Sequence, residues 1–179
     1  MMLVALKGFA GSGKSTLGRA LGRELGWPVI DKDDIKDVLD GHTPEANRLS
    51  YDIMLNVARR QLLQGTSVIC DSPLNFRTLY EAAERVASET GALLVVIQCC
   101  CPDEDVWSER INARKSLGLP SHHQTDWGSF QEYRQRVLPQ TSYPITSPHL
   151  ALETTRPLEE LVAEALAWLQ AQSDRDASG

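Results

Sequence analysis

The sequence predicts an α/β fold in which five parallel strands form one sheet with helices on both faces. Short apolar runs alternate along the chain with longer segments in which apolar residues recur at helical spacing. A glycine-rich turn follows the first apolar run, and 42% of the 179 residues are hydrophobic, which suffices for a buried core. Alternating strands and helices favour a parallel sheet that is covered on both faces. The length favours a single domain over residues 1–179.

Five apolar runs account for the expected strands. The run ALLVVIQC is the most apolar, and such continuous runs are typical of strands buried on both faces. In a parallel sheet, ligands bind beyond the carboxyl ends of the strands, so the residues that directly follow each run are candidates for a site. The expected strands are 3–7, 28–31, 67–71, 92–99 and 150–153.

The segments between these runs carry helical patterns. In the last of them, Pro157 stands at an early position and leucines and alanines form one apolar stripe. The polar, turn-rich segment 118–128, GLPSHHQTDWG, departs from the pattern. It is either a plain surface loop or part of a lid over the site, and we place this lid at approximately 110–138. The expected helices are 14–25, 33–39, 44–63, 76–90, 103–117, 129–138 and 157–170.

Composition and charge argue against two classes of partner. The formal net charge of -6 disfavours broad electrostatic attraction to nucleic acid. No apolar run approaches the roughly 18 residues that cross a bilayer, so we expect a cytoplasmic protein without a membrane partner. We expect it to be a monomer or a homodimer. Three of the four cysteines are consecutive, at 99–101. Neighbours in a strand point to opposite faces, so this run predicts core packing rather than a metal site.

The glycine-rich turn GFAGSGKS, residues 8–15, fits the pattern G-x-x-x-x-G-K-[ST] in full. Glycines let backbone amides approach phosphate closely, and the following helix contributes the positive end of its dipole. Lys14 would reach the β- and γ-phosphates, and the Ser15 hydroxyl would ligate Mg²⁺. The turn therefore predicts a P-loop NTPase that binds a nucleoside triphosphate with Mg²⁺, without distinguishing ATP from GTP. The residues expected to hold the nucleotide here are Gly8, Ala10, Gly11, Ser12, Gly13, Lys14, Ser15 and Thr16.

Three acids, Asp31, Asp33 and Asp34, directly follow the second expected strand. At this edge of the sheet a carboxylate can accept the proton of an attacking hydroxyl group. The alternative is that Asp33 or Asp34 only caps the short helix that follows.

The whole chain resembles the small P-loop kinases, in particular the branch that includes zeta toxin, chloramphenicol phosphotransferase and the polynucleotide 5′-kinase domain. The glycine-rich turn and the segment Asp31-Lys32-Asp33, followed by Lys36, carry the resemblance. It implies that Asp33 is the general base and that Lys36 contacts substrate or phosphate. It also implies that Asp31 supports the Mg²⁺ site.

Asp71 ends the third expected strand, in SVICDSPL. In kinases of this kind, an acid at this position resembles a Walker-B residue that faces the Mg²⁺ or the acceptor. The alternative is a local turn before Pro73. The resemblance places Arg77, with its neighbours Asn75 and Phe76, in the acceptor pocket.

Arg110 and Arg114 lie four residues apart, on one face of an expected helix. The segment is similar to the lid entry of adenylate kinases. This similarity implies that Arg110 lies against the base and that Arg114 stabilises the transferring phosphoryl group, with Lys115 as a weaker candidate. The alternative is a solvated helix face that pairs with Glu104 and Glu109.

Residues after the last expected strand complete the candidate site. The turn in ETTRPLEEL matches the one that flanks adenine in these kinases, so Thr155, Arg156 and Pro157 are expected beside the base, chiefly through backbone contacts. His122 and His123 have no third ligand at a set spacing, which favours contact with substrate over a metal site.

Together these residues predict a kinase that transfers the γ-phosphate of ATP to a hydroxyl of a small molecule such as a sugar, a nucleoside or an antibiotic-like compound. The catalytic candidates are Asp33, Lys14 and Arg114. The metal candidates are Ser15, Asp31 and Asp71, and the substrate candidates are Asp33, Lys36, Asp71 and Arg77. Two alternatives stay open: a kinase of nucleic-acid 5′-hydroxyls, and a non-catalytic nucleotide-binding switch or toxin-like protein.

Overall fold

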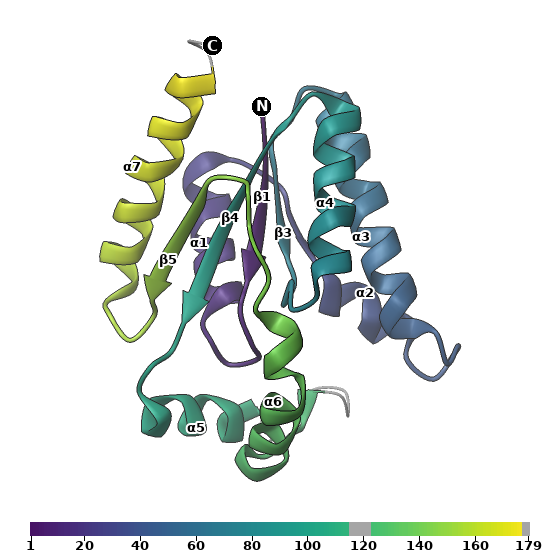
Figure 1. Cartoon of the computed structure of the whole chain (residues 1–179), viewed down its shortest axis with the longest axis vertical. Coiled ribbons are helices and arrows are strands. Elements are labelled where there is room, and N and C mark those ends of the chain that lie inside the picture. Colours follow the sequence, from purple (N-terminus) through teal and green to yellow (C-terminus); the bar gives the residue numbers. More distant parts are fainter. Residues whose placement is uncertain (115–122, 177–179) are drawn as a thin grey trace.

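A computed structural model describes residues 1–114 and 123–176 of the chain. Its strands form one parallel sheet in the order β2-β3-β1-β4-β5 (Figure 1), which confirms the predicted fold class. The strands are β1 (Met2–Lys7), β2 (Val29–Asp31), β3 (Val68–Asp71), β4 (Leu93–Cys100) and β5 (His149–Glu153). Each lies within two residues of the run that predicted it.

The helices follow the predicted order with shifted ends. They are α1 (Lys14–Leu25), α2 (Lys32–Leu39), α3 (Ala46–Leu63), α4 (Arg77–Thr90), α5 (Glu104–Ala113), α6 (Trp127–Thr141) and α7 (Leu158–Asp176). Helix α6 begins two residues earlier than predicted because Asp126 caps it, with its Oδ1 accepting from the Ser129 amide at 2.8 Å. The predicted helical residues 115–117 and the first part of the turn-rich segment, 118–122, lie outside the described residues.

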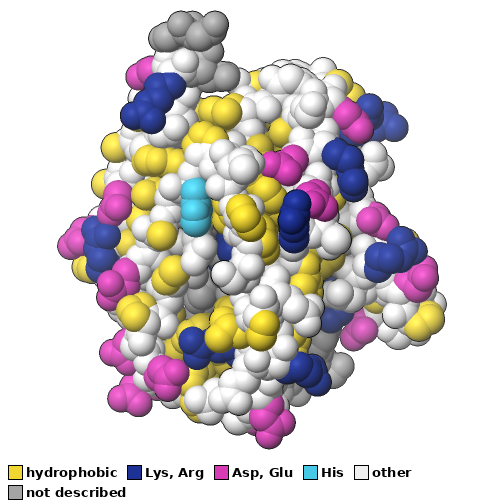
Figure 2. Space-filling model, viewed as in Figure 1, with side chains coloured by type: hydrophobic (Ala, Val, Ile, Leu, Met, Phe, Trp, Pro, Cys, Tyr) yellow, Lys and Arg dark blue, Asp and Glu magenta, His cyan; other side chains and the backbone are white. Residues whose placement is uncertain are grey.

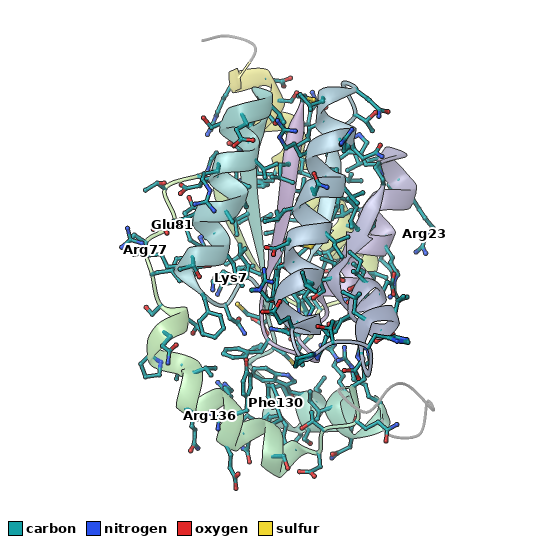
Figure 3. All side chains as sticks on the ribbon, turned by 90° about the vertical axis from the view of Figure 1, so that its right-hand side faces the viewer. Lys7, Arg23, Arg77, Glu81, Phe130 and Arg136 are labelled. Carbon is teal, nitrogen blue, oxygen red and sulfur yellow. The ribbon has the colours of Figure 1, made fainter. Side chains whose placement is uncertain are left out.

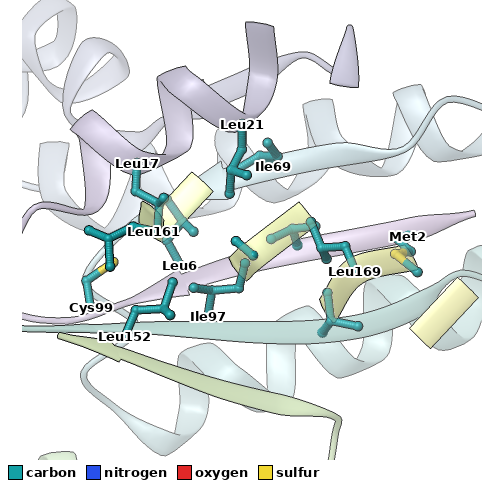
Figure 4. Close-up of a cluster of buried hydrophobic side chains, with 13 residues drawn as sticks. Met2, Leu6, Leu17, Leu21, Ile69, Ile97, Cys99, Leu152, Leu161 and Leu169 are labelled. Atoms are coloured by element: carbon teal, nitrogen blue, oxygen red, sulfur yellow. The ribbon is translucent and has the colours of Figure 1, made fainter. Parts of the chain in front are cut away.

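Alternate residues of β1 point to opposite faces of the sheet and so divide the core in two. Val4 and Leu6 pack with α1 and α7, as the close-up of this cluster shows (Figure 4). Leu3 and Ala5 pack with α3 and α4 on the other face. Each fully buried leucine contributes about 2 kcal/mol. The central strand is therefore fixed from both sides, with its carboxyl end at a set position.

Helices α5 and α6 form a separate layer across the carboxyl end of the sheet, at the bottom of Figure 1. An aromatic cluster joins them, with the Trp107 and Phe130 ring centroids 5.3 Å apart. The Trp107 indole also donates to the carbonyl of Ala10 at 2.8 Å, which ties this layer to the glycine-rich turn. In the part of the chain described, every helix is too short or too polar to cross a membrane.

Candidate active site

The glycine-rich turn connects β1 to α1 in backbone conformations that favour glycine. Gly8 has a φ of 145°, and a Cβ atom there would lie 2.6 Å from the carbonyl oxygen of Cys99. Gly13, with a φ of 88°, is the N-cap of α1, whose first turn carries no acidic residue. The amide of Gly8 donates to Pro73 at 3.0 Å, which anchors the turn to the segment after β3. The result is an open helix N-terminus that suits an anion.

Lys14 is the first residue of α1 and is buried. Its Nζ donates to the carbonyl of Phe9 at 2.9 Å, so the turn holds the ammonium group over its own backbone. Burial lowers the pKa of Lys14, whereas the nearby carboxylates of Asp71 and Asp33 act in the opposite direction. Asp71 and Asp33, two of the predicted metal and catalytic residues, thus act electrostatically on Lys14.

A cavity of about 500 Å³, which we call the loop groove, lies on the α1 and α7 side of the turn. It brings together most of the residues predicted to bind nucleotide, although they come from three segments of the chain. Its charged and polar lining residues are Lys14, Ser15, Thr16, Arg110, Arg114, Thr154 and Arg156. Gly8 and Ser12 instead line a different cavity, described below, and Pro157 lies between the lining residues Arg156 and Leu158.

Arg110 is held toward the loop groove by Thr154, a buried residue that directly follows β5. The guanidinium donates to the Thr154 carbonyl at 2.8 Å and to its Oγ1 at 3.2 Å. That hydroxyl in turn donates to the carbonyl of Ser12 at 2.8 Å. Thr154 therefore connects Arg110 to the glycine-rich turn. Sequence analysis missed it, although a polar residue directly after a strand was the signal that could have found it.

The alternative for the arginine pair, a solvated face that pairs with nearby acids, is not what the described contacts show for Arg110. Its hydrogen bonds go to Thr154 and to the sulfur of Cys101, and Glu104 pairs with Arg134 at 3.4 Å. Arg156 lies exposed at the rim and bonds to Glu164 at 2.7 Å, and hydrogen bonding to this carboxylate raises the pKa of Arg156.

The register between β2 and β3 makes Asp31 and Asp71 direct neighbours. Burial, helped by the charge of Asp71, raises the pKa of Asp31 to about 6. Asp71 is only 3% exposed, and its Oδ2 has no hydrogen-bond partner among the described residues. Two adjacent carboxylates, one with an unsatisfied buried oxygen, fit a divalent cation that would neutralise both.

Magnesium suits this donor set. No group of three or more His, Cys, Asp or Glu side chains within residues 1–114 and 123–176 could hold a metal by itself. Mg²⁺ in phosphoryl-transfer sites uses one or two carboxylates, and water and substrate phosphates complete its shell. The pair Asp31 and Asp71 meets that need.

Asp33 faces Lys32, whose Nζ lies 2.8 Å from the Asp33 carboxylate. Lys32 is buried, bonds to Asn47 at 3.3 Å and lies over the Tyr51 ring at 5.2 Å. The helix cap is Asp31, which accepts from the Asp33 amide at 2.9 Å, so the side chain of Asp33 is not the cap. Sequence analysis assigned Lys32 no role, although its position between two acids was a signal.

The remaining acceptor-side candidates, Lys36 and Arg77, lie on α2 and α4. Lys36 lines a shallow cavity of about 450 Å³ with Asp40 and His42, and burial lowers its pKa. Arg77 is on the outer side of α4 (Figure 3), where it pairs with Glu81 at 2.8 Å.

The predicted lid segment contacts α2 through His123. Its imidazole forms a hydrogen bond with Asp37 at 3.0 Å. His122 and Lys115, the other lid candidates, are outside the described residues.

Comparison with known proteins identifies related sequences. The AAA domain family matches residues 3–138. Uncharacterized proteins of Mycobacterium tuberculosis and Mycobacterium bovis are 33% identical to this chain over 127 residues, which is 63% of this chain. The match spans only about a quarter, 25%, of the length of these curated relatives.

Solved structures share the fold over nearly the whole chain. A protein of Chloroflexus aurantiacus is 23% identical, with 95% of this chain and 96% of that one covered and a TM-score of 0.76. A gluconokinase of Sinorhizobium meliloti is also 23% identical, covers 97% and 94%, and has a TM-score of 0.62. The APS kinase CysC of Mycobacterium tuberculosis, solved with AMPPNP and APS, is 19% identical, covers 94% and 97%, and has a TM-score of 0.67. At these identities the likeness shows the fold.

Proposed function

Because the chain belongs to the AAA domain family, we propose that it is an ATP-dependent phosphotransferase that moves the γ-phosphate of ATP to a hydroxyl group of a small molecule. One observation carries the proposal. Asp71, Arg114 and Asp33 all lie close enough to Lys14 to affect its pKa, although burial is the larger cause. A metal-type carboxylate, a candidate base and a candidate arginine therefore all act electrostatically on the lysine of the phosphate-binding turn.

The loop groove supplies the nucleotide site in this proposal. Backbone amides of the glycine-rich turn and Lys14 bind the phosphates, while Arg110 and Arg156, with Pro157 beside them, flank the base. Ser15, Asp31 and Asp71 would hold Mg²⁺, which when bound neutralises charge on the phosphates.

Asp33 receives the proton of the acceptor hydroxyl as that oxygen attacks the γ-phosphorus, while the bond from the γ-phosphorus to the β–γ bridging oxygen breaks and ADP leaves. The Lys32 ammonium, 2.8 Å away, fixes the direction of this carboxylate. Arg114 stabilises charge that develops on the transferred group. Lys36 and Asp71 contact the acceptor, whereas Arg77 contributes only if it leaves Glu81.

Small hydroxyl compounds are the acceptors of choice. Proteins of this fold are named gluconokinase and APS kinase, which makes sugar acids and nucleotide-like compounds the first candidates. A nucleic-acid acceptor is less well supported, since the net charge is -6. Acidic and basic side chains are interspersed on the face in Figure 2, without a continuous basic field.

The test is a panel of sugars, sugar acids, nucleosides, aminocyclitols and a 5′-hydroxyl oligonucleotide, each incubated with MgATP. We expect one small-molecule class to accelerate ADP release and to gain one phosphate by mass spectrometry. Phosphorylation of the oligonucleotide alone would replace the acceptor class. ATP binding with no acceptor turnover across the panel would favour the non-catalytic switch.

A further inference from the structure

A second cavity, of about 550 Å³, lies behind the glycine-rich turn and shares no lining residue with the loop groove. We call it the rear cavity. Residues from the ends of β1 and β4, from α6 and from the α6–β5 connection line it. Asn75, which follows β3 and was predicted in the acceptor pocket, also lines it. Neither Lys14, Asp33 nor Asp71 lines it.

The rear cavity is lined by cationic side chains and by no acidic one among the described residues. Lys7 is only 7% exposed, and its Nζ donates to the carbonyls of Thr141 at 3.2 Å and Leu74 at 3.3 Å. The ammonium also lies 4.6 Å from the centre of the Tyr143 ring. None of its described partners is a carboxylate, so the buried charge has dipoles around it but no counter-ion.

Arg134 adds a second positive charge at the rear cavity. It lies over the Trp107 ring at 4.7 Å, and its ion pair with Glu104 at 3.4 Å is made to a residue outside the lining. Lys7 ends β1 and lies above Phe130 of the aromatic cluster in Figure 3. The two cations thus come from the sheet and from the lid layer.

Among the neutral polar groups of the lining, His149 and Ser12 can donate hydrogen bonds to a ligand. Burial and the charge of Lys7 lower the pKa of His149, so its imidazole is neutral at neutral pH and can donate one hydrogen bond. The Oγ of Ser12 is buried, in a residue only 1% exposed, and has no hydrogen-bond partner among the described residues. A buried hydroxyl without a partner costs stability unless something satisfies it.

We propose that the rear cavity binds a small oxyanion, the carboxylate or phosphate group of a metabolite. Lys7 and Arg134 neutralise its charge, and the Ser12 hydroxyl and the His149 imidazole donate hydrogen bonds. The ligand is an effector rather than the phosphate acceptor, because neither the candidate base Asp33 nor Lys14 lines this cavity. Ser12 belongs to the glycine-rich turn, so the occupant contacts that turn from behind.

The experiment uses the protein saturated with Mg²⁺ and the ATP analogue AMPPNP, so that the loop groove is filled. Inorganic phosphate and citrate are titrated separately, and NMR follows the His149 ring protons. We expect a saturable shift with at least one probe, and the probe that gives it identifies the ligand source as phosphate or carboxylate. No saturable shift with either probe would overturn the proposal.

Variants locate the response. Lys7→Met should raise the dissociation constant of the effective probe at least about tenfold, since a charged hydrogen bond is lost. Arg134→Gln should raise it about threefold. Its matched control is Arg136→Gln, two residues along on the outer side of α6 (Figure 3), which should leave it unchanged. An equal response in Arg134→Gln and Arg136→Gln would contradict the site, and this comparison holds even if Lys7→Met does not fold.

This test does not depend on phosphotransfer. If the protein binds the probe but phosphorylates no acceptor, the oxyanion site is supported and the proposed function is contradicted. If it phosphorylates a sugar but gives no His149 shift, the proposed function is supported and the oxyanion site is contradicted.

Discussion

Two buried lysines flank the glycine-rich turn, and they differ in what surrounds them. Lys14 lies near the end of the turn, where α1 begins, and the carboxylates of Asp71 and Asp33 partly offset the effect of burial on its pKa. Lys7 precedes the turn, and its described contacts are two carbonyl oxygens and an aromatic ring. Burial lowers the pKa of both, so the difference lies in the neighbouring charges.

Mixed and uniform charge suit different ligands. Around Lys14, cations lie next to two adjacent carboxylates, an arrangement that suits a phosphate chain with a divalent metal. Around Lys7, the lining has no described acid, which suits an oxyanion without a metal. We therefore expect Mg²⁺ to strengthen ligand binding in the loop groove and not in the rear cavity.

The largest predicted effect on nucleotide binding comes from Lys14→Met. Loss of a charged hydrogen bond to phosphate should raise the dissociation constant of MgATP about tenfold to hundredfold. Lys7→Met is the matched control, since it removes a buried lysine on the other side of the turn, and it should change the constant less than about twofold. Isothermal titration measures both, and equal losses would erase the distinction between the two lysines.

Asp31→Asn tests the carboxylate pair through pH. The folded pKa of Asp31, about 6, lies above its ordinary value of 3.8, so the folded state binds this proton more tightly. The free energy of unfolding therefore falls as pH rises through this interval and stays lower above it. Asn can still cap α2 but has no proton to lose.

We accordingly expect Asp31→Asn to stabilise the metal-free protein by about 1–2 kcal/mol near neutral pH and by much less near pH 4. Urea unfolding at the two pH values measures the difference, with the exposed Asp34→Asn as control. A gain of the same size at both pH values would show that the raised pKa is not the cause.

The smallest predicted effect comes from Thr154→Val, which keeps the side-chain volume but removes the hydroxyl. Arg110 would lose one of its two bonds to Thr154, and the Ser12 carbonyl would lose its 2.8 Å donor. MgATP affinity should fall about three- to fivefold. Thr155→Val, at a residue that bonds only to Glu153 among the described contacts, should have no effect on that titration. If the two variants behaved alike, Thr154 would not position Arg110.

The phosphate-binding turn could be predicted from sequence because its function resides in the backbone. Gly8 and Gly13 occupy conformations that favour glycine, so the local pattern alone specifies the turn. The parallel sheet was equally predictable, since each of its strands is a short apolar run. Adjacent sequence thus determines both features.

Contacts between distant segments were not predictable in this way. The neighbourhood of Asp31 and Asp71 depends on the register of β2 against β3, and the bond from Arg110 to Thr154 spans 44 residues. The rear cavity needs Lys7, Arg134 and His149 together, and none of them belongs to a recognised motif. Sequence periodicity does not specify such contacts, because tertiary packing creates them.

The central claim is that Asp33 acts on the acceptor and not on the nucleotide. With the acceptor found in the panel, Asp33→Asn should lower the rate of phosphate transfer at least about hundredfold, as loss of a general base does. Its MgATP dissociation constant should stay within about twofold of the original protein, and Asp34→Asn should change neither quantity. Transfer at an undiminished rate in Asp33→Asn, or an equal loss of nucleotide affinity, would contradict the account.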